Sequence, residues 1–211
     1  MRSDVRASWR LAWGKVGALA EATWRDDRIA IFTRNVQIVL SPSDRFVVTG
    51  EVWLSDRSQL QQLRAEAQQN QSDLELIAIA WEDWGVTTFD KLIGMFGLAV
   101  WDRERQELYL GRDRSGARTV YYTTTGATRW VSSNLRDLAP YRSTELDQIA
   151  LRDYLCCAFV PGDRTMWQQV REIRPGTHLK LPGEEIGGDW QIRQRTGDER
   201  LSLEQWGDQL I

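Results

Sequence analysis

Two neighbouring segments, GLAVWD at 97–102 and ELYLGR at 107–112, constrain the fold of this chain more than any other feature. Successive side chains of an extended strand point to opposite faces, and apolar residues occupy both faces here, as Leu98 and Ala99 illustrate. Strands that are apolar on both faces are usually covered on both faces. Because only four polar residues separate them, the two segments are predicted to form a hairpin in a sheet that lies between two other layers.

Further segments have the composition of strands and are separated by turn residues. They are RIAIFTR (28–34), VQIVL (36–40), RFVVTG (45–50), RTVYYTT (118–124) and TRWVSS (128–133). VREIRPGTHLKL (170–181) is predicted to be one more hairpin around its Pro-Gly turn. The strands together indicate a sandwich of two antiparallel sheets flanked by helices, whereas residues 1–27 give no clear pattern.

Three segments have helical patterns. Ser72 followed by Glu75 forms a capping box at the start of an apolar helix, and strong helix formers fill 56–71. A further helix is predicted at 147–158. Its apolar residues recur at helical spacing and form a stripe that we expect to face the core, and they are Leu151, Tyr154, Leu155 and Ala158.

Composition excludes several classes of protein. The chain has 211 residues, and its 27 Lys and Arg nearly balance 30 Asp and Glu, so it lacks the basic surface that nucleic-acid binding requires. No apolar run approaches the roughly 18 residues of a membrane span, and no secretory signal precedes the first strands. Two adjacent cysteines provide neither a disulfide framework nor a metal site. We expect a cytoplasmic domain that binds no metal, nucleic acid or membrane.

Ordinary catalytic devices are also missing from the pattern. The single histidine, His178, has no accompanying nucleophile motif and is expected to be structural or exposed. Cys156 and Cys157 adjoin the apolar stripe of a helix and are expected to be small core residues rather than a redox pair. The segment GRDRSG (111–116) matches neither a P-loop nor a dinucleotide-binding loop.

Several motifs nevertheless follow one another in a characteristic order. They are TGEVWL, SDLELI, LIGMFGLAVWD with LYLGRDRSGARTVYY, WVSSNLRDL, and a final YL…P…T…V…IRPG. This series resembles the glutaminase domain of asparagine synthetases and related class II glutamine amidotransferases over residues 46–181. The resemblance implies the Ntn-hydrolase fold, an α+β four-layer αββα sandwich, which agrees with strands that are covered on both faces.

The resemblance also implies where catalysis would occur. In that family the nucleophile is a cysteine at the mature N-terminus, and its own α-amine serves as the base. This chain has Arg2 at that point, and Ser3 or Ser8 would become terminal only after further cleavage. The family's Arg-Leu-Ser-Ile motif, whose arginine holds the glutamine carboxylate, is absent. Arg28 and Arg34 lie in the corresponding region without matching it, so no catalytic residue is predicted.

The family motif Asn-Gly-Glu-Ile-Tyr-Asn is Thr49-Gly50-Glu51-Val52-Trp53-Leu54 here. Thr49 replaces the asparagine of the oxyanion hole, and loss of such a donor costs on the order of 100-fold or more in rate. By resemblance, Gly50, Glu51 and Asp73 are the remnants of the substrate site. Gly50 and Asp73 also have structural explanations, since glycine permits close packing and an acidic residue favours a helix N-terminus.

The RDxxG loop of the family is a structural turn near the junction with a synthetase domain, and Asp113 and Gly116 occupy its fixed positions. The resemblance therefore divides the chain into a glutaminase-like domain at 1–190 and a linker at 191–211 that ends in the start of a synthetase-domain helix, LSLEQWGDQLI. ATP and Mg²⁺ are expected only in a following synthetase domain, and no cofactor is expected in this chain.

The prediction for function is a catalytically inert glutamine amidotransferase-like domain of an asparagine synthetase-like, ATP-dependent amide ligase. Its expected partner is a synthetase domain or a separate ligase subunit, with glutamine as a candidate small ligand. Two alternatives stay open. One is an active glutaminase that supplies ammonia for asparagine biosynthesis, and the other is a stand-alone binding or scaffold module.

Overall fold

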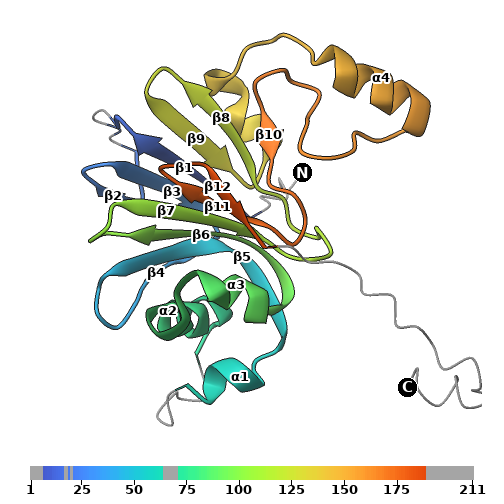
Figure 1. Ribbon diagram of the computed structural model, residues 1–211. Helices are drawn as coiled ribbons and strands as arrows, with labels where there is room; N and C mark the ends of the chain where they lie inside the picture. The colour runs from blue at the N-terminus through green and yellow to red at the C-terminus, as the bar shows by residue number, and fades with distance from the viewer. Residues whose placement is uncertain (1–6, 17–18, 20, 64–70, 189–211) are drawn as a thin grey trace, which may run out of the picture.

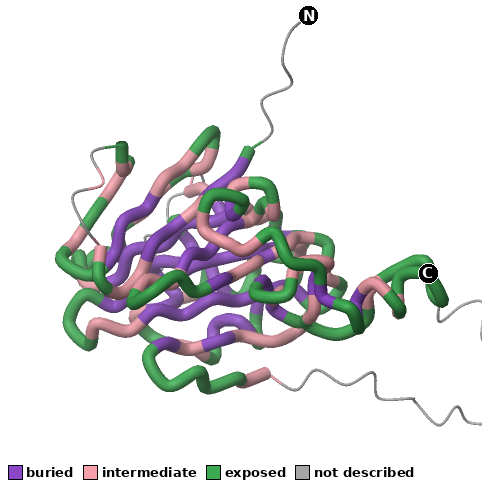
Figure 2. The backbone as a smooth tube through the Cα atoms, turned by 90° about the horizontal axis from the view of Figure 1, so that it is seen from above, coloured by how far each residue is buried: buried purple, intermediate pink, exposed green. Residues whose placement is uncertain are grey.

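The computed structural model describes residues 7–16, 19, 21–63 and 71–188, which form two sheets packed face to face (Figure 1). Within this described part each sheet has six strands, and all strand pairs are antiparallel. The predicted α+β sandwich of two antiparallel sheets is therefore confirmed. Buried residues follow the strands of both sheets through the centre of the molecule, whereas exposed residues lie in the connections (Figure 2).

One sheet, which contains the β6–β7 hairpin and which we call sheet B, has the order β12-β11-β7-β6-β5-β4. Its strands are β4 (Ile38–Leu40), β5 (Phe46–Asp56), β6 (Ile93–Asp102), β7 (Glu107–Arg112), β11 (His178–Leu181) and β12 (Glu185–Gly187). β6 and β7 form the predicted hairpin, with Asp102 paired to Glu107 at its closed end. They lie at the centre of the sheet, which is the position that their apolar residues on both faces predict.

The other sheet, which contains β1 and which we call sheet A, has the order β10-β8-β9-β1-β3-β2. Its strands are β1 (Ser8–Gly14), β2 (Trp24–Asp26), β3 (Ile29–Arg34), β8 (Tyr121–Thr125), β9 (Thr128–Ser132) and β10 (Arg171–Glu172). The predicted hairpin at 170–181 is wrong, because β10 pairs with β8 in this sheet while β11 pairs with β7 in the other. The Pro175-Gly176 turn therefore carries the chain from one sheet to the other.

The two faces of β6 contribute to two separate cores. Ala99 and Trp101 pack between the sheets against residues of β1 and β3 such as Leu11. Leu98 and Val100 point the other way, into the core beneath the helices. This alternation is the physical reason that both sets of positions in the strand are apolar.

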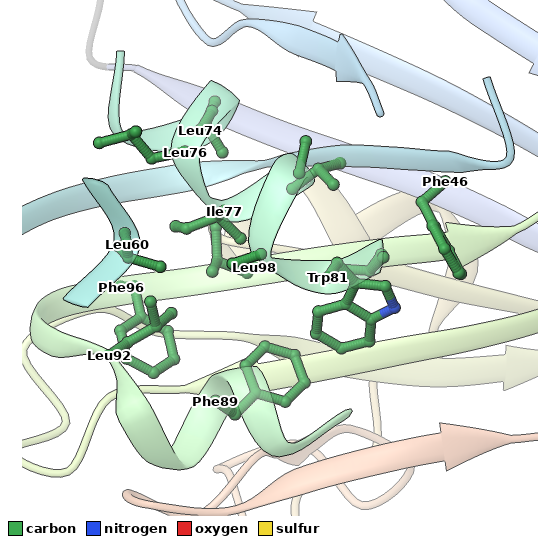
Figure 3. Packing of buried hydrophobic residues seen from close by; sticks show 14 of the residues in the cluster. Phe46, Leu60, Leu74, Leu76, Ile77, Trp81, Phe89, Leu92, Phe96 and Leu98 are labelled. Atoms are coloured by element: carbon green, nitrogen blue, oxygen red, sulfur yellow. The ribbon is translucent and has the colours of Figure 1, made fainter. Parts of the chain in front are cut away.

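Short helices cover the outer face of sheet B (Figure 1), and they are α1 (Ser58–Gln61), α2 (Asp73–Trp84), η1 (Gly85–Thr87) and α3 (Thr88–Lys91). The predicted capping box is present, because the Ser72 side chain accepts from the Glu75 N–H and Glu75 accepts from the Ser72 N–H at 2.7 Å. Trp81 of α2 contacts Phe89 edge to face at a centroid distance of 5.0 Å (Figure 3). Of the helix predicted at 56–71, the structure contains α1, and residues 64–70 lie outside the described part.

The outer face of sheet A is covered more thinly. The 3₁₀ helix η2 (Leu135–Tyr141) packs on it, and Tyr141 stacks on Trp130 with 3.5 Å between the ring centroids. α4 (Gln148–Cys157) follows and lies apart from both sheets in Figure 1.

Two expectations for the helix at 147–158 are therefore wrong. Cys156 and Cys157 are exposed, and so are Tyr154 and Leu155 of its stripe, since no sheet lies against that side of α4.

Candidate functional site

Two adjoining cavities open beside the start of β1 and the middle of β5. Cavity A, of about 610 Å³, is lined by Ala7, Glu51, Ala117, Arg118, Thr119, Tyr121, Ser133, Asn134 and Leu135. Cavity B, of about 390 Å³, is lined by Ala7, Asn35, Val36, Gln37, Gly50, Glu51, Val52, Arg57, Ser72, Asp73, Leu74 and Arg118. Ala7, Glu51 and Arg118 belong to both walls, so the two cavities form one candidate site.

Gly50 lies in β5 beside the site because no larger residue fits there. Its φ is +148°, and a Cβ atom at this position would lie 2.3 Å from the carbonyl oxygen of Gly97 on β6. Close approach of two backbones requires glycine. The requirement comes from strand packing and holds whether or not a substrate binds.

Thr49 does not face the site. Its side chain is fully buried, and its hydroxyl donates to the carbonyl oxygen of Gln37 at 2.9 Å. Thr49 is also absent from the walls of cavities A and B. In this structure the threonine hydroxyl is thus used to connect β5 to the segment before β4.

Glu51, the next residue along β5 after Gly50, does face the site. Its carboxylate forms an ion pair with the Arg118 guanidinium at 3.3 Å, and 18% of the Glu51 side chain is exposed. Arg118 contributes to both cavities and is 41% exposed. A substrate ammonium that approached Glu51 would therefore meet a guanidinium already in contact with this carboxylate.

Asp73 is held in a similar way. It is the first residue of α2, where its charge complements the helix dipole. One carboxylate oxygen accepts from the Leu54 N–H at 2.8 Å, and the other lies 2.7 Å from the Arg57 guanidinium. Both oxygens of Asp73 thus have partners within the protein.

The loop that follows β7 determines where Arg118 lies. Asp113 is fully buried, and its carboxylate accepts from the N–H groups of Phe96, Ala117 and Arg118 and from the Ser115 hydroxyl. Burial by itself raises the pKa of Asp113, but these hydrogen bonds outweigh it and hold the pKa below its ordinary value. The buried carboxylate therefore fixes the backbone from which the Arg118 side chain extends.

Arg112 and Gly116 complete this loop. The Arg112 guanidinium donates to the carbonyl oxygens of Arg118, Ile173 and Gly116 and forms an ion pair with Glu172 at 3.0 Å. Gly116 has a φ of +68°, and a Cβ there would lie 2.9 Å from Pro175. The Asp113 carboxylate and the Arg112 guanidinium thus hold the loop through partners within the protein.

The other arginines and serines considered from the sequence lie elsewhere. Arg28 and Arg34 are exposed and belong to neither cavity wall. Ser8 lines a small separate cavity of about 110 Å³ with Arg10 and Arg34. Arg2 and Ser3 lie outside the described residues.

His178 lines neither cavity A nor cavity B. Its ring stacks on Phe89 with 5.6 Å between centroids, and burial lowers its pKa below the ordinary value although the Asp90 carboxylate opposes this.

Most of the residues that line the site were not predicted from the sequence, and Ala7, Arg57 and Arg118 are the ones that matter most for its chemistry. Arg118 lies two residues after the RDxxG loop and Arg57 lies three residues after the TGEVWL segment, and these positions were the signals that could have indicated them. The chemistry available at the site is limited by its walls. Among the described residues that line cavities A and B there is no cysteine, histidine or lysine.

The described residues contain neither a metal-binding cluster nor a membrane-spanning helix. No group of three or more His, Cys, Asp and Glu side chains within them is arranged to hold a metal ion. None of the described helices has both the length and the apolar character that crossing a membrane requires.

Comparison with known proteins identifies a family model, described as a glutamine amidotransferase domain, that matches residues 22–189. A putative glutamine-hydrolysing asparagine synthetase of Mycobacterium tuberculosis H37Rv is 28% identical over 152 residues, which cover 68% of this chain and 23% of that protein. Asparagine synthetase 1 of Bacillus subtilis is 29% identical over 111 residues, or 52% of this chain and 18% of that protein. The chain thus matches about a quarter or less of the length of these relatives.

Solved structures agree with the fold. Glutamine PRPP amidotransferase of Bacillus subtilis has a TM-score of 0.52 at 16% identity, covering 86% of this chain and 42% of that one. A glutamine aminotransferase class-II domain protein of Silicibacter pomeroyi has a TM-score of 0.51 at 15% identity and is covered over 97% of its length. At this identity the likeness concerns the arrangement of the two sheets.

Proposed function

The chain belongs to the glutamine amidotransferase domain family, and from this premise we propose that it is a member without glutaminase activity. In this proposal the domain has a structural or docking role beside an asparagine synthetase-like amide ligase. The active alternative would hydrolyse glutamine and deliver ammonia.

One observation carries the proposal, namely the inventory of groups that line cavities A and B. Amide hydrolysis by this family needs a nucleophile, a base and a donor to the oxyanion. The described walls contain no thiol, and no imidazole or amine base that could activate one of their hydroxyl groups. Ala7, which precedes β1 and lines both cavities, has only a methyl group. The Thr49 hydroxyl donates to a backbone carbonyl instead of pointing into the site.

The carboxylates that remain do not compensate for these losses. Glu51 and Asp73 would orient a substrate ammonium, but Arg118 and Arg57 already contact them. Because both arginines are more than one-third exposed, each ion pair contributes no more than about 1 kcal/mol. This corresponds to a reduction in ligand affinity of at most about fivefold per pair, so the missing chemistry matters more than the blocking.

The relatives support the proposed partner. Their names describe asparagine synthetases, and the matched region is about a quarter or less of their length. We expect the remaining length of such a protein, on the same chain or a separate subunit, to bind ATP and Mg²⁺ and to form the amide bond. In that arrangement this domain contributes a folded surface for docking and no catalytic group.

The test is glutamate release from millimolar glutamine by the purified chain, with the mass of its N-terminal residue determined in the same sample. We expect no release above the rate without protein, while Bacillus subtilis asparagine synthetase 1 serves as the active control. Steady release that stops when the N-terminal amine is blocked would overturn the proposal and favour the glutaminase alternative.

A variant separates a blocked site from one that has lost its chemistry. Arg118→Ala frees the Glu51 carboxylate, and Arg25→Ala, at an exposed arginine of β2, is the matched control. We expect neither variant to release glutamate. Glutamate release by the Arg118→Ala variant alone would mean that the arginine blocks a competent site. The proposal that the domain has lost its glutaminase chemistry would then be wrong.

A further inference from the structure

The exposed apolar residues of the described chain are concentrated in one place. Five of the nine large hydrophobic residues that are exposed lie between positions 146 and 159, on or beside α4. Leu155 is 76% exposed, Phe159 61% and Tyr154 49%. Clustered exposure of this kind marks an interaction surface, whereas single exposed apolar residues do not.

Tyr154 and Leu155 lie on one side of the helix, whereas Ile149 lies on the opposite side. Residues of an α-helix follow one another at about 100°, which places Leu151, Tyr154, Leu155 and Ala158 within a sector of about 100°. We call these four residues and Phe159 the α4 stripe. Cys156 and Cys157 are more than about 100° from the centre of the stripe, and both thiols are exposed.

α4 is a well-anchored helix despite this exposure. Its N-cap residue Asp147 accepts from the N–H groups of Ile149 and Ala150 at 3.0 Å and forms an ion pair with Arg164 at 2.7 Å. A bridge between Leu146 and Trp167 ties its start to the following segment. Within this fully described helix only Ala150 is buried, so a rigid element presents an apolar stripe that the described residues leave uncovered.

The sequence offers a segment that fits this stripe. Residues 201–211, LSLEQWGDQLI, carry Leu203, Trp206 and Leu210 at the spacing of one helical face, with polar residues between them. A helix of eleven residues is about 16 Å long, close to the 15 Å of a ten-residue helix such as α4. The residues from 189 to 200 reach up to about 40 Å when extended, compared with a radius of gyration of about 16 Å for a domain of this size.

We propose that residues 201–211 form an amphipathic helix that packs on the α4 stripe, so that Leu203, Trp206 and Leu210 cover Leu155 and its neighbours. The occupant is therefore a segment of the same chain. This inference does not depend on whether the glutaminase site is active.

The native cysteines make a sharp test possible in the full chain. Leu155→Cys introduces a thiol on the stripe, next to two thiols that lie off it. Reaction with N-ethylmaleimide, followed by peptide mass analysis, gives a separate rate for each position. We expect the thiol at position 155 to react at least about tenfold more slowly than those at positions 156 and 157, because a single helix covers only one side of α4.

Variants of the segment then identify the occupant. Adding Leu203→Asp and Trp206→Asp should raise the rate at position 155 to that of its neighbours, whereas Gln205→Asp, on the opposite side of the segment, should leave it slow. Equal rates at all three positions without these changes would refute the proposal. Protection of all three that grows with protein concentration would also refute it and assign the stripe to a second copy.

A reciprocal measurement avoids modifying the stripe with cysteine. Hydrogen exchange in residues 201–211 should be slow in the unaltered chain and fast after Leu155→Asp. The control is Ile186→Asp, at a residue of β12 that is 71% exposed and lies outside the stripe. Fast exchange in the unaltered chain, or no response to Leu155→Asp, would exclude the proposed contact.

Discussion

Removing the Asp113 carboxylate should destabilise the domain more than almost any other polar substitution. Asp113→Ala leaves three backbone N–H groups without an acceptor, namely those of Phe96 at 3.3 Å, Ala117 at 3.0 Å and Arg118 at 2.9 Å. A buried donor without a partner costs about 1–3 kcal/mol. The Phe96 N–H is buried, while water reaches the other two in part, so we expect a total loss of about 3–5 kcal/mol.

The assay is urea unfolding followed by tryptophan fluorescence, with Ser115→Ala as the matched control. Ser115 donates only its hydroxyl to Asp113, at 2.6 Å, so its removal should cost about 1 kcal/mol. A loss of 3–5 kcal/mol shifts the urea midpoint by about 1–3 M at ordinary slopes, a large part of the total stability of a domain. If Asp113→Ala unfolds within 0.3 M of the Ser115→Ala variant, the loop does not depend on this carboxylate as we argue.

The pH dependence of the same carboxylate gives an independent check. The folded-state pKa of Asp113 is depressed, so its contribution to stability is full above the unfolded value of about 3.9 and is lost as pH falls through the folded value. Asp113→Asn, which keeps one acceptor oxygen and the shape of the side chain, should remove that part of the acid dependence. An unchanged acid unfolding curve in the Asn variant would contradict the assignment.

Three further outcomes follow from local geometry. Gly50→Ala should lower the free energy of unfolding, measured by thermal denaturation, by at least about 3 kcal/mol, because the new Cβ would collide with the Gly97 carbonyl. The control Gly126→Ala, with φ of +59° and open space around it, should lower it by about 1–2 kcal/mol. Burial, reinforced by a hydrogen bond to Glu107, raises the pKa of Tyr109. Tyr109→Phe should therefore leave the phenol absorbance titration near pH 10 unchanged. The contribution of Tyr109 to the stability of the unaltered protein should be lost as pH rises above about 10, where the phenol ionises in the unfolded chain. Burial lowers the pKa of His178, which is the single histidine of the chain. The midpoint of its NMR titration should therefore lie below about 6.5, and its contribution to stability should be lost as pH falls below that value.

The central sheet could be predicted from sequence because its constraint is local. Residues 97–102 carry apolar side chains on both faces of their strand, and these can all be buried only if both faces of the sheet are covered. In the structure both faces are covered. The hairpin at 170–181 was predicted wrongly for the opposite reason. A Pro-Gly turn determines the local reversal of the chain, but the partner strands β7 and β8 lie far away in sequence, and they place the two arms in different sheets.

The stripe of α4 shows a second limit of sequence patterns. Helical spacing predicted correctly that the apolar residues share one side, but periodicity cannot say which element covers that side. In the described structure no sheet does, so Leu155 and the adjacent cysteines are exposed instead of buried. A pattern of this kind specifies an interface and leaves its partner undefined.

The site was predictable only as far as a family resemblance carries it. Gly50, Glu51 and Asp73 are brought together around cavity B, as the motif order implied, while Thr49 points away from it. Whether they are remnants of a substrate site stays a prediction. The two arginines that contact the carboxylates were missed, because a position shortly after a motif was their only signal, and such a position alone does not distinguish a site arginine from an ordinary surface residue.

Conserving a fold and conserving a reaction make different demands on this chain. Gly50 is required by the approach of β6, Asp73 by the start of α2 and Asp113 by its four hydrogen bonds, and each requirement holds with or without catalysis. Their presence is therefore weak evidence for activity. The informative positions are those whose identity packing does not determine, such as Ala7, which lines both cavities. For this reason the groups that line the cavities are better evidence about the chemistry than the motifs are.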